Sequence, residues 1–202
     1  MTLTVAYQGE AGAFSEMAII AVWGTRAIPL PCEGFGDVVA AVEEGRADAG
    51  MMPTSNAIAG PVADSVAAIE GSTLSIVHTT AIPIRLALLA LPKATLDSLR
   101  SVESHPMALR QCGEFLRAHP RLAARASYDT AGAARAVAAS GDTTRAAIAS
   151  SHAGALNGLA VLASGIEDRA GNVTQFAIVA RDASHNLLRA LADRTPSANL
   201  ER

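Results

Sequence analysis

The chain alternates strand-like and helix-like segments, and polar turns separate them. From the amino terminus, the pattern predicts a strand over residues 1–7, helices over 13–23 and 35–44, a short strand over 47–52 and a helix over 61–70. Such alternation is typical of an α/β protein with a mostly parallel sheet.

The second half of the chain repeats this alternation after a long strand-like run over residues 74–91, which predicts a crossing into a second lobe. Further elements are predicted at 101–103 (strand), from Pro106 (helix), at 125–128 (strand), 130–139 (helix), 146–149 (strand), 151–157 (helix), 176–181 (strand) and 185–193 (helix). We therefore predict two α/β lobes, residues 1–78 with 175–202 and residues 79–174, and a ligand cleft between them.

The composition narrows the classes of function. Half of the residues are hydrophobic but only 3% are aromatic, so the core must consist of Ala, Val, Leu and Ile. A net charge of −3 argues against a nucleic-acid partner, which requires a basic surface. Lys93 is the single lysine and stands in a polar turn, so Schiff-base chemistry and a phosphate-binding P-loop are excluded.

The sequence also gives no support for a metal site, a membrane span or secretion. The five histidines are dispersed without zinc-motif spacing, and no metal is predicted. No apolar run reaches the roughly 18 residues of a membrane span. Cys32 and Cys112 have no CxxC partner, and without a signal peptide a reduced, cytoplasmic setting is expected.

Small polar residues gather where predicted strands meet helices. These junctions lie at residues 9–15, 53–60, 104–106 and 129–132, and a fifth polar stretch, 172–176, enters a strand. Helix N-termini offer free N–H groups and partial positive charge, so the junctions favour a small carboxylate ligand without basic residues. The alternative is that each junction is an ordinary helix cap or turn.

Two more specific sites are disfavoured at these junctions. The turn from Gly9 to Gly12 lacks GxGxxG spacing, and Glu10 would repel a pyrophosphate, which argues against a nucleotide cofactor. Ser104 and His105 are adjacent, and adjacent residues leaving a strand point in opposite directions. Since no GxSxG elbow surrounds Ser104, a hydrolase triad is not expected.

Several stretches in order resemble the catalytic domain of the prephenate dehydratase family. The resemblance covers about residues 5–181, through YQGEAGAFSE (7–16), FGDVVAAVEEGRADAGMMPTSNAIAG (35–60), ESHPMALRQCGEFL (103–116), YDTAGAARAVA (128–138), AAIASSHAGALNGLAVLASGIED (146–168) and NVTQF (172–176). It implies a two-lobed fold similar to type 2 periplasmic-binding proteins, with the active site between the lobes. It also implies a carbon–oxygen lyase of phenylalanine biosynthesis in the shikimate pathway, converting prephenate to phenylpyruvate with loss of water and carbon dioxide.

The resemblance also assigns residues to roles. Thr174 would assist departure of the ring hydroxyl, and Ser104 and Gln111 would take part in catalysis. Substrate-binding positions are expected at Ser15, Asn56, Thr130, Ala131, Gln175 and Phe176. Prephenate is a dianion that supplies its own electrons, so hydrogen-bond donors and exclusion of water suffice and no cofactor is needed.

Two family motifs are altered. The family's Thr-Arg-Phe is here Thr174-Gln175-Phe176, and its Glu-Asn-Ser is here Ser55-Asn56-Ala57. Replacing a charged donor by a neutral one could cost about tenfold in substrate binding. If that arginine paired with that glutamate, both changes form one compensated loss, and residues 55 and 175 should then be neighbours.

Three functions stay open. The first is a prephenate or arogenate dehydratase; the second is a diverged enzyme acting on a related cyclohexadienyl acid, such as a non-aromatising decarboxylase. The third is a non-catalytic carboxylate-binding protein. Only some 20 residues follow Arg181, so we expect no regulatory ACT domain and no feedback inhibition by phenylalanine at such a domain. A homodimer is left open.

Overall fold

The computed structural model describes residues 2–182, and these form two compact units. Unit 1 contains residues 2–8, 15–82 and 173–182, and unit 2 contains residues 9–14 and 83–172. The chain therefore crosses at 82/83 and 172/173, a few residues from the predicted 78/79 and 174/175. As a result Thr174 lies in unit 1, whereas the predicted boundary assigned it to the second lobe.

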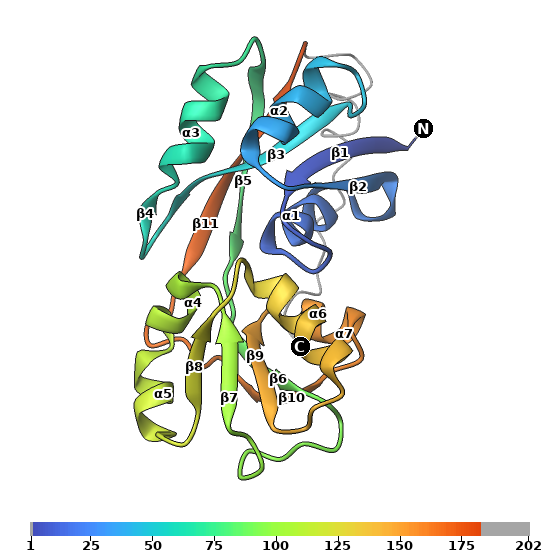
Figure 1. Ribbon diagram of the computed structural model, residues 1–202. Helices are drawn as coiled ribbons and strands as arrows, with labels where there is room; N and C mark the ends of the chain where they lie inside the picture. The colour runs from blue at the N-terminus through green and yellow to red at the C-terminus, as the bar shows by residue number, and fades with distance from the viewer. Residues whose placement is uncertain (1, 183–202) are drawn as a thin grey trace. The chain divides into compact units, whose positions relative to one another are not determined.

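Unit 1 is built on a mixed sheet (Figure 1). Its strands are β1 (Leu3–Gln8), β2 (Ala27–Cys32), β3 (Ala49–Asn56), β4 (Gly60–Pro61), β5 (Ser75–Pro83) and β11 (Val173–Ala180). The strand order is β2-β1-β3-β11-β5, and the short β4 pairs with β3. Strand β1 runs parallel to β2 and β3, whereas β11 runs antiparallel to β3. The last strand of the described chain thus lies inside the sheet of unit 1.

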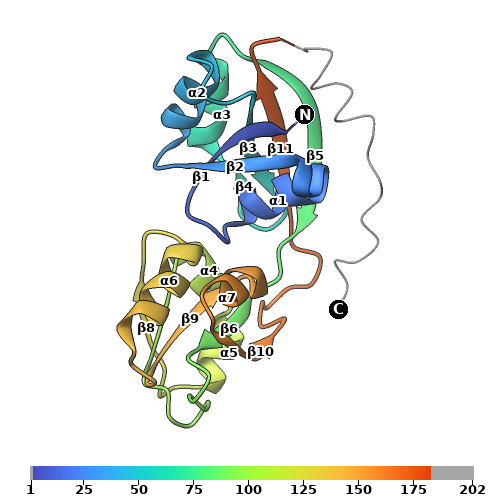
Figure 2. The same cartoon turned by 90° about the vertical axis from the view of Figure 1, so that its right-hand side faces the viewer.

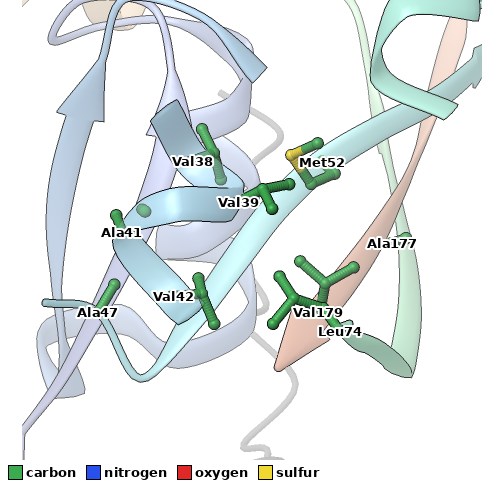
Figure 3. Packing of buried hydrophobic residues seen from close by; sticks show 10 residues of the cluster. Val38, Val39, Ala41, Val42, Ala47, Met52, Leu74, Ala177 and Val179 are labelled. Atoms are coloured by element: carbon green, nitrogen blue, oxygen red, sulfur yellow. The ribbon is translucent and has the colours of Figure 1, made fainter. Parts of the chain in front are cut away.

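Helices cover both faces of this sheet (Figure 2). They are α1 (Phe14–Trp23), the 3₁₀ turn η1 (Gly24–Arg26), α2 (Phe35–Glu43) and α3 (Ala63–Glu70). Val38 and Val42 of α2 pack with Met52 and Val179 in an aliphatic cluster (Figure 3). Gly50 allows this approach, because a Cβ there would lie 2.9 Å from Val179 and 3.0 Å from Val38.

Unit 2 contains a second mixed sheet. Its strands are β6 (Ala87–Ala90), β7 (Ser101–Ser104), β8 (Ala123–Ala126), β9 (Arg145–Ala149) and β10 (Ala160–Ser164), in the order β10-β6-β9-β7-β8. Strand β7 is parallel to β8 and β9, and β6 is antiparallel to β9 and β10. Its helices are α4 (Pro106–Gln111), α5 (Gly113–Ala118), α6 (Thr130–Ser140) and α7 (Ser151–Leu156).

Alanine dominates the core of unit 2. Helices α6 and α7 pack on β6 and β9 through seven alanines with Leu89, Val137 and Leu159. Small side chains let the helices lie close to the sheet: a Cβ on Gly154 of α7 would come within 2.8 Å of Leu89. Across both units the core is mainly aliphatic, as the composition predicts, but Trp23, Tyr7 and Phe176 are also buried in it.

The predicted elements correspond to observed ones with several differences. The strands β2, β4 and β10 were not predicted, and the run 74–91 is divided into β5 and β6. The helix from Pro106 is interrupted at Cys112, whose backbone departs from helical geometry. The helix predicted over 185–193 lies outside the described residues.

Neither a membrane-spanning helix nor a metal cluster occurs in the described part of the chain. No helix within residues 2–182 combines the length and the apolar character needed to cross a bilayer. Within the same residues, no three His, Cys, Asp or Glu side chains are grouped so that they could hold a metal ion.

Candidate functional site

In unit 1, Thr174 and Asn56 form a cross-strand pair. They are register partners on the antiparallel strands β11 and β3, so their side chains are direct neighbours. The Asn56 Nδ2 donates a hydrogen bond of 2.9 Å to the Thr174 Oγ1. Thr174 is 9% exposed, which leaves its hydroxyl in a largely desolvated position.

The orientation of the Asn56 amide is fixed by the turn that follows it. Its Oδ1 accepts hydrogen bonds from the backbone N–H of Ile58 (3.0 Å) and Ala59 (2.9 Å). The Nδ2 must therefore face Thr174 and the Val173 carbonyl, 3.4 Å away. Because Asn56 donates to the Thr174 oxygen, the hydroxyl proton of Thr174 is left to donate elsewhere.

A β-bulge follows Thr174. Gln175 pairs with Ser55, but Phe176 pairs with Pro53, so the register shifts between Gln175 and Phe176. Thr54, opposite the bulge, donates from its Oγ1 to the Gln175 carbonyl at 3.2 Å. Bulges re-aim side chains next to functional sites, and here Gln175 is exposed whereas Phe176 is 1% exposed and belongs to the core.

The register also places residues 55 and 175 opposite each other. This confirms that Ser55 and Gln175, the two altered family positions, are neighbours. Ser15, the remaining predicted residue of unit 1, lies in the first turn of α1 and is 8% exposed.

In unit 2, Ser104 is fully buried at the end of β7. Its Oγ donates a 2.5 Å hydrogen bond to the carbonyl of Ile148 on the neighbouring strand β9. The donor of this hydroxyl is thus used within the sheet, and only its oxygen lone pairs remain for another partner.

Gln111, the last residue of α4, is held by the segment just before β11. Its Oε1 accepts a hydrogen bond from the Asn172 Nδ2 at 3.3 Å, and its backbone carbonyl accepts one from the Asp168 N–H at 2.6 Å. Sequence analysis did not single out Asp168 or Asn172 as site residues. Asn172 opens the NVTQF stretch and Asp168 ends the stretch 146–168, so both lie in segments that resemble the family, but the resemblance gave neither residue a role.

Thr130 and Ala131 begin helix α6, where Asp129 is the N-cap. The Asp129 Oδ1 accepts from the Gly132 backbone N–H, so this helix end already holds a carboxylate. Burial raises the pKa of the Asp129 carboxyl, and the Gly132 hydrogen bond partly offsets that rise. Ala131 is 1% exposed, and Thr130 is half-buried.

Glu10 stands beside this helix end in unit 2 and is bound by Arg135. The Arg135 guanidinium contacts both oxygens of the Glu10 carboxylate, one of them at 2.7 Å from Nη2. This hydrogen-bonded pair holds the pKa of Glu10 below its usual value. The Glu10 charge is thus balanced within unit 2.

The predicted residues fall into two groups, one in each unit. Unit 1 brings together Thr174, Asn56, Gln175 and Ser55, and unit 2 joins Gln111 to Asp168 and Asn172. The described chain is therefore a two-unit α/β protein, and each unit carries neutral hydroxyl or amide side chains among the predicted positions.

The chain belongs to the prephenate dehydratase family. The family model described as "Prephenate dehydratase" matches residues 5–184. "Arogenate dehydratase 5, chloroplastic" of Arabidopsis thaliana is 41% identical over 186 residues, which cover 90% of this chain and 43% of the relative. The chain therefore spans less than half the length of this curated relative.

Solved structures agree with the family and the fold. The prephenate dehydratase of Arthrobacter aurescens, in complex with L-Phe, is 31% identical, with a TM-score of 0.83 over 90% of this chain and 61% of that one. A periplasmic substrate-binding protein of an ABC transporter from Coxiella burnetii has a TM-score of 0.50 over 95% of this chain and 91% of that one. At 14% identity the second likeness shows the fold alone. The expected α/β fold, similar to periplasmic-binding proteins, is confirmed.

Proposed function

We propose that this chain is a lyase that converts prephenate to phenylpyruvate, with Thr174 as the group that assists departure of the ring hydroxyl. One observation carries the proposal: the Asn56 amide, fixed by two backbone N–H groups, donates to the Thr174 oxygen. The Thr174 hydroxyl is thereby kept as a donor. Family membership supports the choice of reaction.

The reaction needs such a donor and little else. In prephenate the bond between the ring and its carboxylate breaks, and the released electron pair forms the last double bond of the aromatic ring. The ring C–O bond breaks at the same time, so the products are phenylpyruvate, carbon dioxide and hydroxide. A donor aimed at the departing oxygen stabilises the charge that develops there, and Thr174 supplies it without a cofactor.

The remaining residues of the proposal bind or position. Gln111 and the exposed Gln175 offer amide donors to the anionic substrate. The other proposed substrate-binding positions are Ser15, Thr130, Ala131 and Phe176. We assign Ser104 a positioning role at the end of β7, since its donor is bound to Ile148. A homodimer and a cytoplasmic setting remain predictions.

The amino analogue arogenate is the alternative substrate. A relative 41% identical to this chain is named an arogenate dehydratase, and a structure 31% identical is named a prephenate dehydratase. The neutral Gln175, where the family has arginine, supports some divergence toward another cyclohexadienyl acid. A non-catalytic carboxylate-binding role is the third outcome that an assay must separate.

The test is a direct assay with both substrates. Purified protein is incubated with prephenate, and phenylpyruvate is followed by its absorbance in alkali; with arogenate, phenylalanine is measured by amino-acid analysis. We expect phenylpyruvate to form, Thr174→Val to lower kcat by about 100-fold or more, and Thr174→Ser to retain most of the activity. The Ser variant is the matched control because it keeps the hydroxyl and removes a methyl group.

Each other outcome contradicts the proposal in a different way. Loss of prephenate without an aromatic product would indicate a non-aromatising enzyme. Tight binding of either acid without turnover would indicate a binding protein. Full activity of Thr174→Val would remove Thr174 from the mechanism while leaving the reaction in place.

A further inference from the structure

The segment that ends at Asn172 contacts Gln111 through both its backbone and a side chain. Asp168 donates its N–H to the Gln111 carbonyl at 2.6 Å, and its carboxylate accepts from the N–H groups of Gly113 (3.0 Å) and Glu114 (2.8 Å). Helix α5, which begins directly after Cys112, is therefore capped by a residue more than 50 positions away. The break between α4 and α5, at which Gln111 lies, is thus held from this segment.

Asn172 is itself firmly placed. It is 3% exposed, and its carbonyl accepts a 2.8 Å hydrogen bond from the N–H of Ile84. Its Nδ2 donates to the Gln111 Oε1 at 3.3 Å. A side-chain amide has one oxygen that accepts and one nitrogen that donates, so occupation of Oε1 by Asn172 turns the Gln111 Nε2 to other partners.

We propose that Asn172 is a positioning residue that keeps Gln111 as a hydrogen-bond donor toward the anionic substrate. This inference rests on the proposed function, in which Gln111 is a substrate-contacting amide. The substrate is a dianion, so an amide nitrogen contributes to its binding, whereas an amide oxygen in the same place would repel it. Asn172 selects between these two orientations without touching the substrate.

Substitution of Asn172 distinguishes positioning from packing. At pH 8, Asn172→Asp introduces a carboxylate of the same shape that accepts hydrogen bonds, so it holds the Gln111 Nε2 and exposes Oε1 to substrate. Asn172→Ala leaves the Gln111 amide free to adopt either orientation. We therefore expect kcat/KM to fall in the order wild type, Asn172→Ala, Asn172→Asp, with a loss of about 10- to 100-fold for the Asp variant.

The loss should appear as a raised KM with a smaller change in kcat, as expected for a binding contact. A packing role predicts instead that each variant loses kcat/KM in step with its thermal stability, because alanine removes packed atoms and aspartate buries a charge. Gln111→Glu should raise KM like Asn172→Asp, since it keeps the acceptor for Asn172 and removes the donor. Asn157→Asp is the matched control: Asn157 of unit 2 donates to the Ala153 carbonyl at 2.8 Å, so its kinetics should equal wild type.

A second measurement is independent of turnover and of the proposed function. The sequence has three glutamines, Gln8, Gln111 and Gln175, so ¹⁵N-glutamine labelling gives three side-chain amide signals in the NMR spectrum. The signal assigned to Gln111 should shift in Asn172→Asp and stay in place in Asn157→Asp. Absence of turnover in the wild type would refute the proposed function alone, whereas an unchanged Gln111 signal, or an Ala variant weaker than the Asp variant, would refute the role of Asn172.

Discussion

The Thr174 hydroxyl can both accept and donate, and the Asn56 amide engages its accepting side. An Asn at this position therefore does more than fill space beside the threonine. Its Oδ1 is bound to Ile58 and Ala59, and this contact forces the amino group toward Thr174. Two neutral residues thus define a directed hydrogen-bond donor.

Asn56→Asp tests whether the hydrogen bond from Asn56 directs the Thr174 hydroxyl. The carboxylate can still accept from Ile58 and Ala59, so thermal stability should change little. It can no longer donate to Thr174, whose hydroxyl would instead donate to the carboxylate and be lost to the substrate. We expect kcat for prephenate to fall by about 100-fold, measured by phenylpyruvate formation. A variant with wild-type kcat would show that the Asn56–Thr174 hydrogen bond does not direct the hydroxyl.

The Glu10–Arg135 pair gives unit 2 a pH-dependent contribution to stability. The hydrogen bonds from Arg135 hold the folded pKa of Glu10 below the ordinary value of a glutamate, so the pair contributes its full stabilisation above that ordinary value. The contribution is lost as the pH falls through the folded pKa. The loss of Tm caused by Arg135→Gln should therefore be larger at pH 7 than at about pH 3, because it shrinks as the pH falls through the folded pKa of Glu10.

Arg121→Gln is the control for this experiment, since Arg121 is an exposed arginine of the same unit. Its Tm should match wild type at both pH values. An equal loss for Arg135→Gln at neutral and acidic pH would mean that Arg135 stabilises by packing of its side chain instead of by charge.

At the scale of elements, the antiparallel pair β3–β11 carries the two altered family positions opposite each other. Ser55 and Gln175 are register partners, and directly opposed side chains in such a pair lie about 4.5–5.5 Å apart at Cβ. A glutamate and an arginine placed there would be close enough to form an ion pair. The geometry is thus compatible with a coordinated loss of both charges.

Restoring the family residues at positions 55 and 175 tests whether the two charges were lost together. Ser55→Glu alone places an anion beside the proposed substrate site, and we expect it to raise KM for prephenate by about tenfold. Gln175→Arg together with Ser55→Glu should restore KM to within a few-fold of wild type. A double variant as impaired as Ser55→Glu would show that the two positions act independently.

The order of elements was predictable because hydrophobic alternation and glycine-bearing turns are local signals. The edge strand β2 was missed since Pro29 and Pro31 argue against a strand, yet an edge strand tolerates proline where its N–H would face away from the ladder. The break at Cys112 was missed for another reason: Asp168, which caps α5, is distant in sequence.

In the candidate site, too, the residues could be predicted from the sequence but their long-range contacts could not. Resemblance to a family indicated Thr174, Asn56 and Gln111, and chemistry explained why neutral groups suffice. Neither could indicate that the Ser104 hydroxyl donates to Ile148, because that contact depends on the pairing of β7 with β9. The role of Asn172 likewise depends on a contact between residues 61 positions apart.

At the scale of the whole molecule, the chain passes between the two units four times, at 8/9, 14/15, 82/83 and 172/173. The segment 9–14 follows β1 and ends at the first residue of α1, but it belongs to unit 2. It is anchored there by the Ser150 Oγ, which donates to the Gly12 carbonyl at 2.9 Å. Unfolding of either unit should therefore disturb the other.

Trp23 makes this coupling measurable. It is the single tryptophan of the sequence and lies 2% exposed in α1, so its fluorescence reports on unit 1. We expect urea unfolding followed by Trp23 fluorescence to coincide with unfolding followed by far-UV circular dichroism, which reports on both units. Two separated midpoints would show that the units unfold independently.

The interior place of β11 also sets the order in which the protein can form on the ribosome. Strand β11 lies between β3 and β5, so the sheet of unit 1 stays divided until residues 173–180 have left the exit tunnel. All residues of unit 2 are made earlier. At a synthesis rate of about 5–20 residues per second, the nascent first half must wait for seconds with an open sheet, and the later-made unit is the first whose segments are all available to fold.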